Sequence, residues 1–112
     1  MSELARRDCD ACKLGATLVT DAEAAELRQQ IPAWQLVETD GIKQLTRTFQ
    51  FSNFAAALAF TREIGAIAEE ANHHPRLVTE WGRVGVTWWT HKIRGLHVND
   101  FIMAARVDAI AE

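Results

Sequence analysis

Apolar and polar positions alternate along the stretch from Ile42 to Phe51, and this alternation predicts a strand of an antiparallel sheet. Leu45, Arg47, Phe49 and Phe51 share one parity, whereas glutamine and threonine residues occupy the other. Such a pattern places one face of a sheet against the core and the other in water. Arg47 interrupts the apolar face, so we expect it to lie near an edge of the sheet.

Three further strands are indicated by short runs rich in β-branched and aromatic residues, bounded by turn sequences. Thr39-Asp40-Gly41 is a turn sequence that joins the first two strands, and Gly82-Arg83 is the expected turn of a second hairpin. The predicted strands are residues 34–38, 42–51, 76–81 and 84–90.

Apolar residues at steps of three and four predict a long amphipathic helix between the two hairpins. It begins at Phe54, with Ser52 or Asn53 as its cap, and runs for about 18 residues. Pro75 ends it, because the residue before a proline is pushed out of helical geometry. We therefore expect His73 in or just after the last turn.

Two shorter helices flank the strands. Thr20 and Glu23 have the spacing of a capping box, which predicts a first helix over residues 21–31 that Pro32 stops. A final helix is expected to reach about Ile110, with Asn99 or Asp100 as its cap.

The predicted order is helix, two strands, helix, two strands and helix. Hairpins separated by helices predict a two-layer α+β domain, in which the helices cover one face of a four-stranded antiparallel sheet. A length of 112 residues fits a single domain. We assign residues 20–112 to that domain and residues 1–19 to an N-terminal arm.

Composition excludes some classes of function. Twelve basic and fifteen acidic side chains give a net charge of −3, which argues against binding nucleic acid through its phosphates. No apolar run approaches the roughly 20 residues of a membrane span. Residues 1–13 are polar and lack the apolar core of a signal peptide, so we expect a cytoplasmic protein.

Cys9 and Cys12 form a lone Cys-x-x-Cys pair in the arm. A structural zinc site needs two more ligands at a similar spacing, and the chain has no second pair. We interpret the two residues as reduced thiols, with a metal or redox role as the alternative.

All four histidines fall between Glu69 and Asp100. Histidine titrates near neutral pH, so such a cluster with carboxylates at both ends can donate and accept protons. Glu69 and His73 are four residues apart, which predicts a hydrogen bond between them on one helix face. His74 leaves the helix in a different direction.

His91 at a strand end and Asp100 at a helix start are positions that a small domain can bring to one rim. The chain has no nucleophile motif and no glycine-rich phosphate loop. General acid–base chemistry without a covalent intermediate remains, such as dehydration, hydration or isomerisation.

Other interpretations of these residues stay open. His73 and His74 before Pro75 could serve only to cap the helix, and the cluster could instead bind zinc or iron, although its spacing is not His-Glu-x-x-His. We expect Trp81, Trp88 and Trp89 in the core or an interface.

The spacing of the cluster resembles the signature of the pterin-4a-carbinolamine dehydratases. The shared elements are Glu69-x-x-x-His73-His74-Pro75, Trp81, His91 and Asp100. The resemblance extends over about residues 20–111, and its flanking matches are Ile31-Pro32-Ala33-Trp34, Phe49-x-Phe51-x-Asn53-Phe54, Trp88-Trp89-Thr90-His91 and Asn99 to Arg106. The Cys9-x-x-Cys12 arm and the run at 79–82 are similar to bacterial members that accompany phenylalanine hydroxylase.

This resemblance implies an α+β fold and dehydration of 4a-hydroxytetrahydrobiopterin to quinonoid dihydropterin. It implies that His73, His74 and His91 are the catalytic residues, with His73 and His91 transferring protons and His74 binding and positioning the pterin. It also implies that Glu69 and Asp100 orient these histidines. Substrate contacts are implied for Trp34, Pro75 and Trp81.

The resemblance also implies that the pterin is the substrate, so no further cofactor and no metal are expected. It implies a homodimer or homotetramer, with phenylalanine hydroxylase as a candidate partner and no nucleic acid or membrane partner. A non-catalytic module that regulates a hydroxylase or a transcription factor is the alternative.

Overall fold

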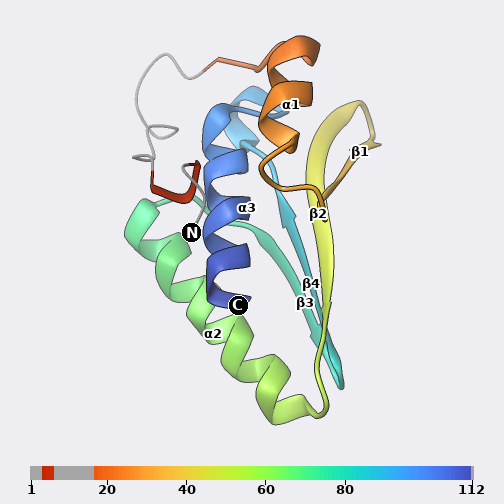
Figure 1. The fold of residues 1–112 in the computed structure, drawn as a ribbon, viewed down its shortest axis with the longest axis vertical. Coiled ribbons are helices and arrows are strands. Elements are labelled where there is room, and N and C mark those ends of the chain that lie inside the picture. Colours follow the sequence, from red (N-terminus) through yellow and green to blue (C-terminus); the bar gives the residue numbers. More distant parts are fainter. Residues whose placement is uncertain (1–3, 7–16, 112) are drawn as a thin grey trace.

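A computed structural model describes residues 4–6 and 17–111, and in this part of the chain the helices cover one face of a four-stranded sheet (Figure 1). The helices are α1 (Asp21–Arg28), α2 (Phe54–Ala71) and α3 (Val98–Ala111), the strands are β1 (Gln35–Thr39), β2 (Ile42–Gln50), β3 (Arg76–Glu80) and β4 (Arg83–Trp88), and two 3-10 turns are η1 (Leu4–Arg6) and η2 (His91–Ile93). The predicted α+β class and element order are confirmed.

The sheet has the strand order β1-β2-β4-β3, with every neighbouring pair antiparallel. Leu45 pairs with Trp88 and Phe49 with Val84, and all four side chains are buried beneath the helices. Thr48, on the opposite parity of β2, is exposed. The alternation read from the sequence therefore identified the core face correctly.

Arg47 lies on a central strand, one residue beyond the last pair that β2 forms with β1. The expectation that Arg47 lies near an edge of the sheet holds only on the side of β1, where the pairing has ended. On its other side, Arg47 still pairs with Val86 of β4. The Arg47 guanidinium donates to Asp108 of α3 at 2.7 Å and lies 4.3 Å from the centre of the Phe49 ring. These two contacts stabilise the positive charge of Arg47 on the face of the sheet that the helices cover.

The capping box of α1 is present as predicted. The Thr20 hydroxyl accepts from the Glu23 N–H at 3.1 Å, and the Glu23 carboxylate accepts from the Thr20 N–H at 2.8 Å. The hydrogen bonds with Thr20, chiefly that of its backbone N–H, hold the pKa of Glu23 below its ordinary value. The helix ends at Arg28, earlier than the predicted residue 31, because a tighter turn precedes Pro32.

The two hairpin turns differ in how well the sequence placed them. Asp40 and Gly41 join β1 to β2, both with positive φ, as the turn sequence predicted. The second turn is Trp81-Gly82 and not Gly82-Arg83, since Arg83 already pairs with Glu80. Gly82 has φ +79, a backbone conformation that glycine adopts without steric cost.

Part of the N-terminal arm packs against the domain. Leu4 is fully buried, and the Arg106 side chain of α3 donates to the Ala5 carbonyl at 3.1 Å. Cys9 and Cys12 lie outside the described residues, so the prediction for these thiols stays untested. No helix in residues 4–6 and 17–111 has the length and apolar character to cross a membrane.

Candidate active site

The chain turns sharply where α2 ends, and this turn separates the two adjacent histidines. Asn72 adopts the left-handed conformation, with φ 52 and ψ 42, which asparagine tolerates better than most residues. The His73 N–H donates to the Ala68 carbonyl at 3.1 Å, the long bond of a Schellman-type helix end. His73 therefore lies beyond the regular helix.

The predicted hydrogen bond between Glu69 and His73 is wrong. Glu69 contacts His74 instead, with 2.5 Å between its Oε1 and the His74 Nε2. The i, i+4 relationship requires helical geometry at both residues, and the left-handed Asn72 removes it. Both partners of the observed pair are exposed, at 55% for the His74 side chain and 80% for that of Glu69.

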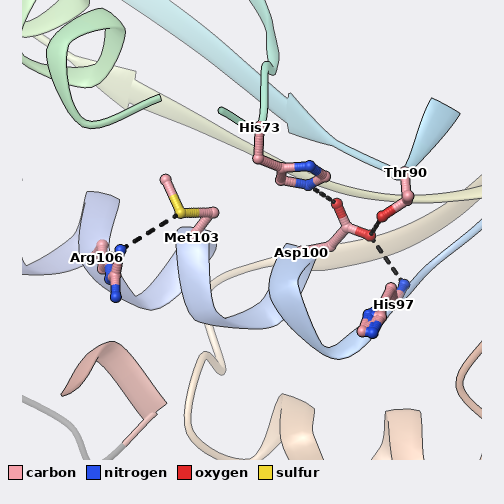
Figure 2. A network of polar contacts seen from close by, with 6 residues as sticks. All are labelled: His73, Thr90, His97, Asp100, Met103 and Arg106. Carbon is pink, nitrogen blue, oxygen red and sulfur yellow. Dashed lines mark hydrogen bonds and ion pairs between the residues drawn. The ribbon is translucent and has the colours of Figure 1, made fainter. Parts of the chain in front are cut away.

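His73 pairs with the carboxylate at the other end of the cluster. Figure 2 shows the His73 ring directed at the Asp100 carboxylate. The His73 Nε2 lies 2.6 Å from Asp100 Oδ1, and the exposed fractions of the two side chains are 7% and 0%. The imidazole also stacks on the Trp88 indole, with 5.5 Å between ring centres and 10° between planes. The structure therefore joins residues 27 positions apart in a buried pair.

Asp100 receives two more hydrogen bonds on its second oxygen. The Thr90 hydroxyl donates to Oδ2 at 2.7 Å, and the His97 N–H donates at 2.9 Å. Because α3 starts at Val98, Asp100 lies in its first turn, and the expectation that Asn99 or Asp100 precedes the helix as its cap is wrong. A carboxylate is favourable there because the helix dipole is positive at that end.

His91 opens η2 and lies next to Thr90 in the sequence. Its ring stacks on Trp89, with 4.5 Å between ring centres and 26° between planes. Thr90 and Gly95 form an isolated bridge that closes the loop containing His91. His91 is thus tied, through Thr90, to the same edge of the molecule as Asp100.

Sequence reasoning missed two features of this site. Trp88 is buried in the core as expected, but the stacking of Trp88 and Trp89 on His73 and His91 was not foreseen. Thr90 was not singled out, although it stands directly before His91 in the Trp88-Trp89-Thr90-His91 match. That adjacency was the available signal.

Comparison with known proteins identifies the family. The family model described as pterin 4 alpha carbinolamine dehydratase matches residues 17–110. The chain belongs to this family. The name denotes a hydro-lyase, an enzyme that removes water from its substrate.

Two curated relatives carry the same name in the form "putative pterin-4-alpha-carbinolamine dehydratase". The protein of Syntrophotalea carbinolica is 54% identical over 112 residues, covering 100% of both chains. That of Nitrosococcus oceani is 52% identical over 110 residues, covering 98% of this chain and 97% of its own.

Two solved structures resemble the fold. The "transcriptional coactivator/pterin dehydratase" of Brucella melitensis has a TM-score of 0.77 and 33% identity, covering 86% of this chain and 100% of its own. A "pterin dehydratase-like protein" described as a RuBisCO assembly factor in the alpha-carboxysome has a TM-score of 0.60 and 28% identity, covering 70% and 89%.

The three residues expected to contact the substrate, Trp34, Pro75 and Trp81, lie in varied surroundings. Trp34 is fully buried, and its indole N–H donates to Asp108 at 2.8 Å. Trp81 is 71% exposed at the β3–β4 turn, about 20 Å along β3 from Pro75 at a strand rise of roughly 3.3 Å per residue. Substrate contacts by Trp34, Pro75 and Trp81 stay predictions.

Two of the described histidines, His73 and His74, each pair with one carboxylate. In residues 4–6 and 17–111, no three side chains of histidine, cysteine, aspartate or glutamate are grouped so that they could hold a metal ion. In the neutral tautomer that carries its proton on Nε2, His73 donates to Asp100 and leaves Nδ1 as a proton acceptor. Such an arrangement suits general acid–base chemistry.

Proposed function

We propose that this protein dehydrates 4a-hydroxytetrahydropterins, such as 4a-hydroxytetrahydrobiopterin, to the quinonoid dihydropterin and water. Family membership and the names of relatives that are 54% and 52% identical support this substrate class. The observation that carries the proposal is the buried pair of His73 and Asp100, because it supplies an oriented imidazole that can exchange protons.

The reaction needs two proton transfers. One group protonates the departing 4a-hydroxyl, which leaves as water, and another removes the proton on N5 as the C4a–N5 double bond forms. We assign these transfers to His73 and His91, with Asp100 orienting His73. The substrate exists as two 4a epimers, so the two histidines can exchange the roles of acid and base.

His74 is assigned to binding and positioning the pterin, and Glu69 to orienting His74. The exposed ring of His74 and its 2.5 Å contact with Glu69 support this division, because neither is enclosed as His73 is. The pterin is the substrate of this reaction and not a resident cofactor.

The physiological role we propose is to restore the cofactor of an aromatic amino-acid hydroxylase in the cytoplasm, with phenylalanine hydroxylase as a candidate partner. We also propose a homo-oligomer. Large apolar side chains on the surface support association, namely Trp81, Phe54 and Leu58 at 71%, 46% and 42% exposed. Light scattering across a concentration series would test the oligomer.

The dehydratase proposal is tested with pure, chelator-treated protein and 4a-hydroxytetrahydropterin generated in the cuvette. We expect the protein to speed formation of the quinonoid product, followed by absorbance, and the double variant His73→Ala/His91→Ala to lose this effect. Glu70→Gln, a change beside the cluster, serves as the control and should retain full activity. No acceleration by the unaltered protein would refute the proposal.

The alternative is a non-catalytic assembly or regulatory role, favoured by the similar structure described as a RuBisCO assembly factor. This alternative predicts that the double variant keeps the protein's whole function in cells. A hydroxylase-dependent growth assay separates the two, since the dehydratase proposal predicts that the double variant fails in it.

A further inference from the structure

Thr90 is a buried polar residue that the reaction scheme leaves without a role. It is 4% exposed and lies between the end of β4 and the loop that carries His91. Its hydroxyl has one proton, and because an ionised carboxylate only accepts hydrogen bonds, Thr90 must donate to Asp100 Oδ2 across the 2.7 Å contact.

This donation is one of three hydrogen bonds that the Asp100 carboxylate accepts. Donors reach it from the chain after α2 (His73), from the segment after β4 (Thr90) and from the N-terminus of α3 (His97) (Figure 2). Oδ1 accepts from His73, whereas Oδ2 accepts from the other two. The two donors on Oδ2 fix the plane of the carboxylate, so Oδ1 stays directed at the His73 ring.

The backbone of Thr90 is fixed as well. Its N–H donates to the Gly95 carbonyl at 2.8 Å, and the Gly95 N–H donates back at 3.4 Å. These bonds close the loop that begins with His91. One residue therefore contacts the partner of His73 with its side chain and anchors His91 with its main chain.

We propose that Thr90 is a positioning residue that holds Asp100 in the orientation needed by His73 and keeps the His91 loop in register with it. The effect of Thr90 on catalysis rests on the proposed function. Its effect on the orientation of Asp100 and His73 does not depend on the substrate. In this role the Thr90 hydroxyl keeps the proton of neutral His73 on Nε2, which leaves Nδ1 to exchange protons with the pterin.

The test compares Thr90→Val, which removes the hydroxyl at nearly constant volume, with Thr90→Ser, which keeps it. We expect kcat of Thr90→Val to fall by about tenfold with KM little changed, as when an orienting partner of a functional histidine is removed. Thr90→Ser should recover most of the loss. Thr90→Ala, smaller but also without the hydroxyl, replaces the valine variant if valine does not fold.

A second readout does not depend on turnover. In ¹⁵N NMR spectra of the ring nitrogens, His73 of the unaltered protein should be protonated at Nε2, and Thr90→Val should populate the other tautomer. Thr79→Val is the matched control, because it removes a threonine hydroxyl bonded to Thr61 at 2.6 Å, away from Asp100. It should leave kcat and the His73 tautomer unchanged.

Unaltered kcat and an unaltered His73 tautomer in Thr90→Val would overturn the inference. A shifted tautomer in a protein that does not act on pterins would uphold the positioning role and refute only the dehydratase proposal. A loss in Thr90→Val that Thr90→Ser does not recover would also count against it, because the hydroxyl would then not be the cause.

Discussion

The two neighbouring histidines, His73 and His74, each contact a carboxylate, and the two contacts are almost equally short. The His73–Asp100 distance is 2.6 Å and the His74–Glu69 distance is 2.5 Å. Their surroundings differ completely, since the first pair is buried and the second lies in solvent. Distance alone therefore does not determine what a histidine–carboxylate pair contributes.

Solvent explains the difference. Around an exposed pair, water and salt screen the attraction, and holding two side chains in place offsets much of what remains. Within the fold, the attraction is stronger, but each unpaired polar group is costly to bury. The two additional hydrogen-bond donors to Asp100 offset that cost, because they satisfy its second oxygen. We expect the buried pair to govern stability and proton transfer, and the exposed pair to affect binding alone.

Replacing Asp100 should have the largest effect on this comparison. In Asp100→Asn, an amide NH2 at the place of Oδ1 cannot accept from His73, so either the buried Nε2–H loses its partner or the His73 ring is forced into the other tautomer. We expect the free energy of unfolding to fall by about 3 kcal/mol, the size typical of breaking a buried pair. Urea denaturation measures this change, and the dehydratase assay should show a loss of about 100-fold or more in kcat.

An Asp100→Asn protein that unfolds at the same urea concentration as the parent would contradict the argument. A matched measurement on Thr79→Val shows how much stability the loss of one ordinary hydroxyl contact costs in this fold. The Asp100 variant should lose clearly more than that.

The turn at Asn72 is expected to have the next largest effect, because it creates the difference between the two histidines. In the left-handed conformation any Cβ crowds the following carbonyl, and the short polar side chain of asparagine offsets this strain by local hydrogen bonding. Asn72→Ala keeps the Cβ and loses that compensation, so we expect a cost of about 1 kcal/mol. Asn72→Gly avoids this clash and should stay close to the parent in stability. Urea denaturation of both variants checks the order, and an alanine variant more stable than the glycine variant would contradict it.

The fold was predictable because it depends on patterns that are local in the sequence. The alternation in residues 42–51 and the three- and four-residue steps after Phe54 each fix which side of an element is apolar, and the capping box at Thr20 marked a helix start. Errors of one to three residues arose at element ends, as at Gly82 and Val98. At these positions several neighbouring residues are equally suited to start or end the element, so the sequence does not single out one of them.

The site was predictable as a set of residues but not as a set of contacts. The histidine-rich segment and the family signature named His73, His74, His91, Glu69 and Asp100. The pairing of Glu69 was wrong because one left-handed residue, Asn72, rotated the chain out of helical register. Thr90 was missed because a buried threonine shows its role only once Asp100, ten residues further on, is brought against it.

Removing the exposed contact should have the smallest effect. In Glu69→Gln, His74 loses a screened partner that is 80% exposed, so we expect the free energy of unfolding to change by less than about 0.5 kcal/mol. Glu70→Gln is the matched control, since it removes the same charge one residue away. Urea denaturation should barely distinguish the two variants from each other or from the parent.

The activity of Glu69→Gln makes the sharper measurement. If His74 positions the pterin, loss of its partner should raise KM by about two- to threefold and leave kcat nearly unchanged, because the interaction would be uniform between ground and transition states. High salt should abolish the difference from Glu70→Gln, since the Debye length falls to about 3 Å at 1 M. If Glu69→Gln lost as much stability or kcat as Asp100→Asn, solvent would not be screening the exposed pair. Burial would then not explain the difference between the two histidines, and only the direction in which each leaves the chain would distinguish them.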